Sequence, residues 1–193
     1  MYKIGITGGI GAGKSTVSFI FSILGIPHYN ADRRARILME NEESLKDRIK
    51  SLLGEEAYRE GKLNSSWIAD RVFSDPWQLN KLNGIVHPAV EKDYIQWHQD
   101  QDGGHYTLKE AALLFDAGSY LKLDATIVVT ASEDIRIQRV SVRDGLTVQQ
   151  VRSRMDQQWP EDRRILMADF IIDNNGQIPL VSQVMKIHEE LKA

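Results

Sequence analysis

The sequence predicts an α/β fold built on a five-stranded, doubly wound parallel sheet. Three observations support this prediction: a glycine-rich stretch lies between a strand-like and a helix-like segment near the N-terminus, short apolar runs without alternation recur along the chain, and helical patterns separate those runs. Such runs are typical of strands covered on both faces. Their alternation with helices indicates right-handed crossovers between parallel strands.

The glycine-rich stretch at residues 6–16 reads "ITGGIGAGKST" and has the spacing of a phosphate-binding loop. "YKIGIT" before it is suited to a buried strand, and "STVSFIFSILG" after it has helical apolar spacing. Glycines let backbone N–H groups turn toward phosphate oxygens, and the helix points its positive end at the same anion. Lys14 would reach the β- and γ-phosphates, and Ser15 would bind Mg²⁺. The candidate nucleotide-binding residues of the loop are Gly8, Gly9, Gly11, Ala12, Gly13, Lys14, Ser15 and Thr16.

A dinucleotide-binding loop fits the same stretch less well. That motif requires a third glycine, and when Gly11 and Gly13 supply the first two, the third position holds Thr16. The loop therefore predicts a P-loop NTPase fold, of which the nucleoside-monophosphate-kinase type is one form. The loop does not say whether water, another protein or a small molecule receives the phosphate.

The strand-like runs divide a single predicted domain into a core and two helical insertions. The predicted strands are residues 2–7, 26–29, 112–116, 125–130 and 169–173. The core comprises residues 1–32, 110–131 and 169–193, a helical acceptor lobe covers about residues 33–109, and a helical lid covers about residues 132–168. A chain of 193 residues is long enough to bury one core of this kind.

The acceptor lobe contains a strong helix start. Asp75 is a suitable N-cap, Pro76 takes the favoured first helical position, and Gln78 is placed for a capping box. A long helix should follow, with a possible interruption at His87 and Pro88, because proline removes a backbone donor. A helical lobe on a phosphate-binding core is suited to cover an acceptor.

The lid should contain two or three helices and no strand. Ser132 begins one helix, and Thr147 with Gln150 forms a capping box for another. Several arginines occur in this segment: Arg136, Arg139 and Arg143 on one helical stripe, then Arg152, Arg154, Arg163 and Arg164. They form either a solvated basic face or a phosphate clamp, and their position after the end of a strand favours the clamp.

Two carboxylates follow predicted strands, where ligands bind in open α/β sheets. Asp32 could orient an acceptor hydroxyl toward the γ-phosphorus, or it could cap the helix "RRARILMEN". Asp116 could hold magnesium through water, contact the acceptor, or cap the next turn. Phosphoryl transfer needs little early proton removal, so orientation by Asp32 would matter more than its basicity.

Composition narrows the functional classes. The net charge of −3 argues against a general nucleic-acid binder, and the lack of cysteine excludes disulfides, thiolate metal sites and a cysteine nucleophile. Met1 leads directly into the first strand without a signal sequence, and no apolar run approaches the roughly 20 residues of a membrane span. We therefore expect a soluble cytoplasmic protein, a monomer or small homo-oligomer, without membrane partners.

Several motifs together resemble the dephospho-CoA kinase family. They are "GITGGIGAGKST", "NAD" at residues 30–32, "LNGIVHP" at 82–88, "ALLFD" at 112–116, "RVSVRD" at 139–144 and "ADFIIDNNG" at 168–176. The resemblance implies ATP-dependent phosphorylation of the ribose 3′-hydroxyl of dephospho-CoA, giving coenzyme A and ADP. It also implies that Asp32 is the catalytic carboxylate, that Arg139 and Arg143 lie in or near the nucleotide lid, that Asn175 lies by the adenine, and that His87 belongs to the acceptor lobe.

Two positions depart from the family pattern. Asn30 stands where the family usually has aspartate, which removes one charge but keeps Asp32. Asp116 stands where the family usually has glutamate, which withdraws the acid by one methylene, so a direct contact would need water or a small backbone shift. His87 could equally pack between helices.

Three other functions compete with this one. A nucleoside-monophosphate kinase would share the core and lid but not "LNGIVHP". A regulatory GTPase needs an Asn-Lys-x-Asp motif, and "LNKLNG" has Asn83 in place of the aspartate. A nucleotide-binding module without catalysis predicts that replacing Asp32 would be silent.

Overall fold

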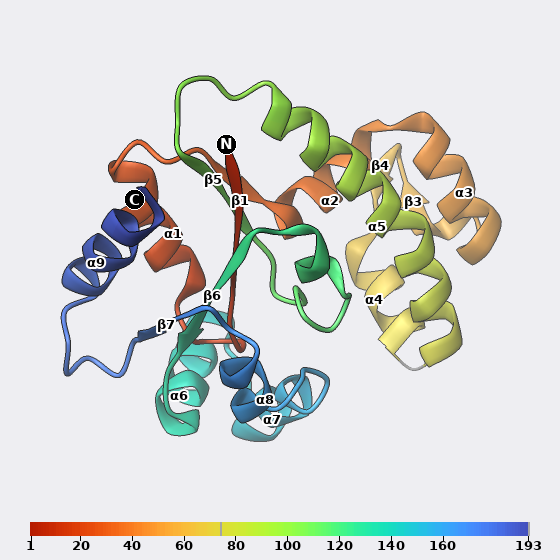
Figure 1. Cartoon of the computed structure of the whole chain (residues 1–193). Helices are drawn as coiled ribbons and strands as arrows, with labels where there is room; N and C mark the ends of the chain where they lie inside the picture. The colour runs from red at the N-terminus through yellow and green to blue at the C-terminus, as the bar shows by residue number, and fades with distance from the viewer. Residues whose placement is uncertain (74, 193) are drawn as a thin grey trace. The chain divides into compact units, whose positions relative to one another are not determined.

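The computed structural model describes residues 1–73 and 75–192. The chain forms two compact units (Figure 1). The first contains Met1–Asn30 and Gln101–Ala193, and the second contains Ala31–Asp100. The second unit is therefore an insertion in the chain of the first.

The first unit is built on a five-stranded parallel sheet in the order β2-β5-β1-β6-β7. Its strands are β1 (Tyr2–Thr7), β2 (His28–Asn30), β5 (Tyr106–Glu110), β6 (Ala125–Thr130) and β7 (Phe170–Asp173). Its helices are α1 (Lys14–Ile23), the short η2 (Ser119–Lys122), α6 (Glu133–Asp144), α7 (Val148–Met155), α8 (Glu161–Leu166) and α9 (Leu180–Lys192). The predicted α/β class with a five-stranded parallel sheet is confirmed.

One face of the sheet is covered by α1 and α9, which lie side by side in Figure 1. Alternate strand residues point to this face and join Val17 and Phe21 of α1 with Val184 and Ile187 of α9 in one core. The opposite face is covered at Gly5 by the segment after β5. A methyl group on Gly5 would lie 2.7 Å from Leu114 Cδ2, so the absence of a side chain there permits this close packing.

The third predicted strand, residues 112–116, is wrong. The strand is β5, six residues earlier, and residues 112–116 form turns on the sheet face with Leu114 and Phe115 buried. All five residues of β5 are buried, including Lys109 and Glu110. These charged side chains hide the apolar signal of the strand, and the neighbouring "ALLF" has a stronger one.

His188 shows how α9 is fixed to the sheet. The Tyr106 hydroxyl lies 2.8 Å from His188 Nδ1, and both residues are buried. Burial raises the pKa of Tyr106 and lowers the pKa of His188, so the contact joins two neutral groups. A histidine on an amphipathic helix is usually at the surface, but this one is buried by its contact with the sheet.

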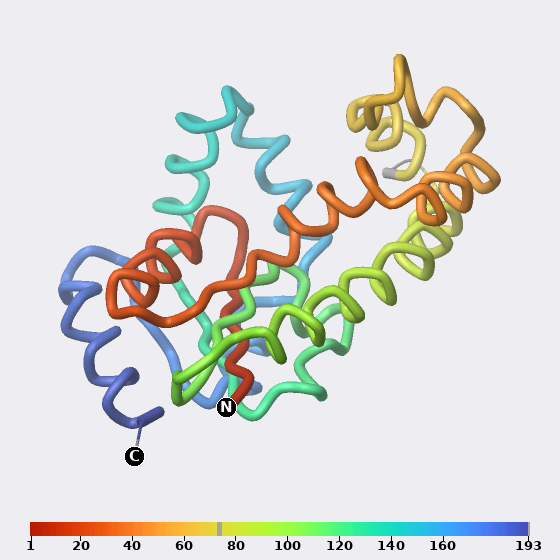
Figure 2. The backbone as a smooth tube through the Cα atoms, turned by 90° about the horizontal axis from the view of Figure 1, so that it is seen from above, coloured from red at the N-terminus to blue at the C-terminus, as the bar shows by residue number. Residues whose placement is uncertain are grey.

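The second unit is mainly helical. Its elements are α2 (Ala31–Asn41), α3 (Glu43–Leu53), η1 (Glu55–Ala57), β3 (Tyr58–Arg59), β4 (Lys62–Leu63), α4 (Ser65–Phe73) and α5 (Pro76–Gln99). The helix α5 packs against α2, α3 and α4, and Figure 2 shows α2 and α5 running side by side. Asp93 of α5 accepts a 2.8 Å hydrogen bond from Arg34 Nε of α2.

Asp75 caps α5 as predicted, because its side chain accepts hydrogen bonds from the backbone N–H groups of Trp77 and Gln78. The possible interruption at Pro88 does not occur, and α5 continues to Gln99. One apolar stripe continues along the helix from before the proline, at Val86, to after it, at Val90 and Tyr94, and these side chains are buried. Burial of this stripe stabilises the helix across Pro88. Within the described chain, neither α5 nor any other helix has the length and hydropathy that a membrane crossing requires.

We predict that Tyr106→Phe lowers the free energy of unfolding by about 1–3 kcal/mol, because His188 Nδ1 would stay buried without its partner. Urea unfolding measures this change. Tyr2→Phe is a matched control, since Tyr2 pairs with Tyr106 in register across β1 and β5 but is 61% exposed. Equal effects of the two substitutions would contradict the assigned contact.

Candidate active site

The phosphate loop runs between β1 and α1 and passes very close to three other segments. A methyl group added to Gly8 would lie 2.2 Å from the carbonyl oxygen of Val129. On Gly11 it would lie 2.6 Å from the carbonyl oxygen of Arg136, and on Gly13 it would lie 2.2 Å from Asn174 Nδ2. Gly11 and Gly13 also have positive φ angles of 80° and 97°. Glycine is therefore required by both space and conformation.

The start of α1 is arranged to face an anion. Gly13 is the N-cap and contributes no side chain, and the first turn contains no acidic residue that would compete for the N–H groups. Lys14 Nζ curls back over the loop and donates to the carbonyl oxygen of Gly8 at 2.9 Å. The predicted loop residues thus lie together between β1 and α1, with the Lys14 ammonium folded back onto the carbonyl oxygens of Gly8 and Gly9.

Ser15 contacts a carboxylate that the sequence did not reveal. Its hydroxyl donates to Glu110 Oε1 at 2.8 Å, and His28 Nε2 lies 3.0 Å from Glu110 Oε2. Glu110 is only 3% exposed. Burial alone would raise the pKa of Glu110, but the contacts with His28 and Ser15 outweigh it and hold the pKa below its usual value. Glu110 is therefore a buried, ionised carboxylate beside the loop.

The sequence does not single out Glu110, because the apolar run at residues 112–116 predicts the strand too late in the chain. It is the last residue of β5, at the edge of the sheet where ligands bind. Asp116 lies beyond the strand, where its Oδ1 accepts a 2.9 Å hydrogen bond from the backbone N–H of Trp159. The structure thus brings Glu110 into contact with Ser15, and it connects Asp116 to the lid segment.

Arg139 and Arg143 differ in their surroundings. Arg139 Nη2 donates to the carbonyl oxygen of Asn174 at 3.0 Å, and Arg139 Nη1 is 3.5 Å from the carbonyl oxygen of Gly11. Arg143 is exposed and makes a bidentate contact with Asp144. Of the two arginines that the resemblance places in or near the nucleotide lid, Arg139 therefore contacts the loop and Arg143 is turned toward Asp144.

Two further arginines converge on the loop at Gly9. A methyl group on Gly9 would lie 1.9 Å from Arg136 Nη1 and 2.9 Å from Arg164 Nη2. Both arginines are buried and share Glu161, whose Oε2 is 3.1 Å from Arg136 Nη1 and 4.0 Å from Arg164 Nη2. Burial, together with the charge of Arg136, lowers the pKa of Arg164 despite the opposing effect of Glu161. Arg136 Nε and Arg164 Nε and Nη1 have no hydrogen-bond partner among the described residues.

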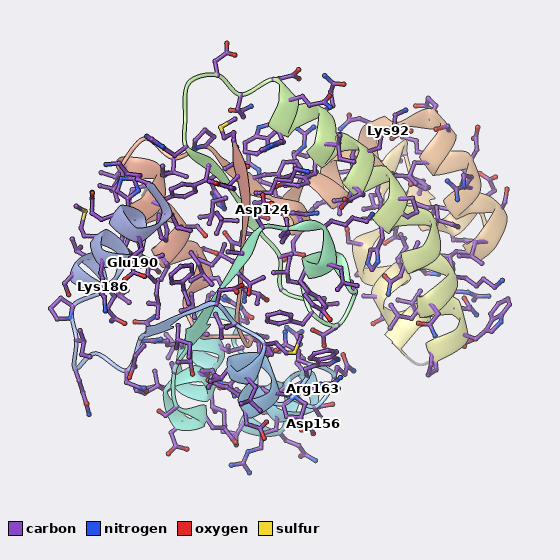
Figure 3. All side chains as sticks on the ribbon, in the orientation of Figure 1. Lys92, Asp124, Asp156, Arg163, Lys186 and Glu190 are labelled. Carbon is purple, nitrogen blue, oxygen red and sulfur yellow. The ribbon has the colours of Figure 1, made fainter. Side chains whose placement is uncertain are left out.

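An aromatic stack fixes the segment before α8. The rings of Phe115 and Trp159 are nearly parallel, with centroids 6.1 Å apart. The Arg163 guanidinium, labelled in Figure 3, lies 3.4 Å from the Trp159 centroid. Gln158 Oε1 accepts a 2.9 Å hydrogen bond from the backbone N–H of Ile10 in the loop. This end of the predicted lid therefore contacts the phosphate loop directly.

The asparagines after β7 close the other side of the loop. Asn174 Nδ2 donates to the carbonyl oxygen of Ala12 at 2.8 Å. Asn175 Oδ1 accepts from the backbone N–H of Ser132 at 2.8 Å, so Asn175 joins the end of β7 to the start of α6. The pair thus ties the loop and the lid to one strand end.

The remaining predicted residues belong to the second unit. Asp32 is exposed in the first turn of α2, two residues beyond the end of β2. Because α2 already begins at Ala31, Asp32 is not the N-cap of this helix. His87 is exposed on α5, which disfavours the alternative that it packs between helices.

We predict that Gly13→Ala weakens ADP binding at least tenfold, because the new methyl group would strike Asn174 Nδ2 and the backbone would be strained at φ 97°. Isothermal titration calorimetry measures the affinity. Gly25→Ala is a matched control, since Gly25 has a φ of 83° but nothing within 4 Å of the added methyl group. Both variants should lose about 1 kcal/mol of stability from backbone strain, and an equal loss of ADP affinity in both would refute the steric argument.

A family model, sequence relatives and a solved structure all match the family that the sequence motifs resemble. The family model for dephospho-CoA kinase matches residues 2–179. The dephospho-CoA kinase of Syntrophotalea carbinolica is 39% identical over 92% of this chain and 86% of its own length. That of Porphyromonas gingivalis is 37% identical over 100% and 95%. The structure of dephospho-CoA kinase from Campylobacter jejuni aligns with a TM-score of 0.71 at 25% identity and covers 98% of this chain and 96% of its own. The chain therefore belongs to the dephospho-CoA kinase family of phosphotransferases.

Proposed function

We propose that this chain transfers the γ-phosphoryl group of ATP to the 3′-hydroxyl of the ribose of dephospho-CoA, giving coenzyme A and ADP. The observation that carries the proposal is the complete phosphate loop with Lys14 and Ser15, in a chain whose family phosphorylates this acceptor. Lys14 already contacts two loop carbonyl oxygens, at 2.9 and 3.4 Å, so a small rotation would bring its ammonium onto the phosphates.

Magnesium fits the donor set at Ser15. The Ser15 hydroxyl and the Glu110 carboxylate are hard oxygen groups within 2.8 Å of each other, which is the chemistry that Mg²⁺ prefers. Within the described part of the chain, no group of three or more His, Cys, Asp or Glu side chains could hold a metal. In a P-loop site, the phosphates and water supply most of the magnesium ligands. Bound magnesium would neutralise charge on the phosphate oxygens.

The buried arginines supply the remaining positive charge. Arg136 and Arg164 reach the loop at Gly9 and have N–H groups without partners among the described residues, which suits an incoming phosphoryl group. Arg139, at Gly11, and Arg143 would assist, although Arg143 would first have to leave Asp144. Asn175 remains the candidate beside the adenine.

Asp32 remains the proposed catalytic carboxylate. It lies just past the carboxyl end of β2, where ligands bind in open α/β sheets, and a carboxylate there is placed to orient the acceptor hydroxyl. His87 and Asp116 are the other proposed acceptor contacts, and Asp116 has a buried Oδ2 without a partner among the described residues. Asp116 also remains a candidate to hold the metal through water.

The proposal predicts that ADP release depends on the acceptor. With ATP and magnesium, ADP should appear in step with coenzyme A when dephospho-CoA is present and should be nearly absent without it. Mass spectrometry identifies the phosphorylated product. ADP release that is equal with and without the acceptor would favour a hydrolytic switch, and phosphorylation of a nucleoside monophosphate instead would favour a kinase of that type.

We predict that Asp32→Asn lowers kcat at least about 100-fold and leaves ATP affinity within twofold, because a positioned carboxylate contributes mainly to the transition state. Steady-state kinetics and ATP titration separate the two effects. Glu40→Gln is the matched control, since Glu40 is on the same helix and forms an ion pair with Arg36 at 3.0 Å. If Asp32→Asn is silent, or if it weakens ATP binding as much as turnover, Asp32 has no role in the chemical step.

A further inference from the structure

We propose that Glu161 is the internal counter-anion of Arg136 and Arg164 while the phosphate loop is empty, and that a phosphate group of the bound nucleotide takes its place. The inference deepens the proposed function and rests on it only for the binding of a nucleotide at the loop. Arg136 lies near the start of α6, whereas Glu161 and Arg164 lie one turn apart on α8. The three charges therefore meet only because two separate helices pack beside the loop.

Both arginines approach the loop at the end where the outer phosphates of a nucleotide bind. Their guanidinium groups converge on Gly9, where an added methyl group would lie 1.9 Å from Arg136 Nη1. Lys14 Nζ lies 3.4 Å from the carbonyl oxygen of the same glycine. The lysine of this motif reaches the β- and γ-phosphates. A phosphate held by Lys14 would therefore lie close to both arginines.

The arginine pair is incompletely satisfied by Glu161. Each guanidinium has five N–H donors, yet the two groups share one carboxylate oxygen, Glu161 Oε2, which is 3.1 Å from Arg136 Nη1 and 4.0 Å from Arg164 Nη2. Arg136 Nε and Arg164 Nε and Nη1 are buried without hydrogen-bond partners among the described residues. Buried donors of this kind are costly unless an acceptor reaches them. A phosphate group, with several oxygens, matches two guanidinium groups better than one carboxylate does.

The charge on the pair is also incompletely balanced. Burial lowers the pKa of Arg164, the carboxylate of Glu161 raises it, the charge of Arg136 lowers it, and Asp116 has the smallest effect and raises it. The pKa is lowered overall, so the negative charges of the protein do not fully compensate the buried arginine. An additional or stronger anion would therefore be stabilised beside the pair.

Glu161 is placed to give way to such an anion. Its side chain is 24% exposed, against 9% for Arg136 and 3% for Arg164, so an anion from solvent meets the carboxylate first. Its other oxygen, Oε1, accepts a hydrogen bond from Thr130 Oγ1 at the end of β6. Oε2 can therefore turn toward water while Thr130 still holds Oε1. The arginines would pass from the carboxylate to the phosphate without losing a negative partner.

This exchange should weaken nucleotide binding. The phosphate must replace an existing ion pair, and the displaced carboxylate stays nearby and repels it. A unit charge a few ångströms away in a poorly screened site changes anion affinity by about tenfold or more. In return, Glu161 neutralises buried arginines that would otherwise lack a counter-charge when no nucleotide is bound.

The competing explanation is that Glu161 only ties α8 to β6 and α6. Removal of a structural tie would loosen the helices around the loop, so nucleotide affinity would fall or stay the same. Removal of a competing anion predicts the opposite sign, because nucleotide affinity would rise even though the empty protein loses stability. The sign of the change in affinity therefore separates the two explanations.

The experiment is calorimetric titration of the whole chain with the non-hydrolysable ATP analogue AMP-PNP in the presence of magnesium. In Glu161→Gln, which removes the charge but keeps an oxygen that can accept from Arg136, the Kd should fall at least about tenfold. In an Arg136→Gln background, the same substitution should lower the Kd by no more than about threefold, because half of the positive pair is missing.

Asp162→Asn is the matched control. Asp162 follows Glu161 in the first turn of α8 and is exposed, and its Oδ1 accepts a 2.8 Å hydrogen bond from the backbone N–H of Arg163. This variant removes the same charge from the same turn and should leave the Kd within twofold. Glu161→Asp, which withdraws the carboxylate by one methylene, gives a second test if Glu161→Gln folds poorly. It should bind AMP-PNP at least threefold more tightly than the unaltered chain.

Unchanged or weaker AMP-PNP binding in Glu161→Gln, or in Glu161→Asp where Glu161→Gln does not fold, would overturn the proposal. An equal gain in Asp162→Asn would also overturn it, since the effect would then be one of net charge. A gain that persists in full in the Arg136→Gln background would overturn the part assigned to Arg136. These outcomes are distinguishable from failure of the proposed function, because AMP-PNP binding does not involve dephospho-CoA. A chain that makes no coenzyme A would still support the inference if the gain in affinity is found.

Discussion

The close passage of the phosphate loop past three other segments is the constraint on which the rest of the structure depends. At Gly8, Gly11 and Gly13 the backbone comes so near to β6, α6 and Asn174 that no side chain fits. This proximity fixes the direction in which α1 leaves the sheet, and hence where its positive end points. It also places Ser15 against Glu110. The binding geometry is thus a consequence of backbone packing, on which the charged side chains are then arranged.

The charged groups around the loop already have partners within the protein. Lys14 donates to loop carbonyl oxygens, Arg136 and Arg164 share Glu161, and Glu110 is held by Ser15 and His28. A phosphate that arrives here would exchange one set of polar partners for another. Groups held in this way lose little freedom on binding, which reduces the entropic cost of association.

The pattern of the sequence predicted most of the fold because local signals and tertiary structure agree there. The runs at residues 2–7 and 125–130 coincide with β1 and β6, and the capping signals at Asp75 and at Thr147 with Gln150 are confirmed. The signal failed at β5, where Lys109 and Glu110 are buried although they are charged, and where Glu110 contacts Ser15 and His28 from other elements. The burial of His188 against a tyrosine far away in sequence has no local sequence signal either.

The candidate site was predictable to the same extent. A phosphate loop is local in sequence, so its residues could be named from their spacing. The contacts of Glu110 with His28, and of Arg136 and Arg164 with Gly9, join residues from separate elements, and no spacing rule encodes them. The contact of Glu110 with His28 follows from the strand order, which places β5 between β2 and β1. The helical insertion lies in the connection between the parallel neighbours β2 and β5. Two parallel neighbouring strands need a crossover connection of about a dozen or more residues, but their pairing sets no upper limit on the length of that connection. The part of this connection beyond Asp32 could therefore change in length, in evolution or by engineering, while every strand of the sheet keeps its register.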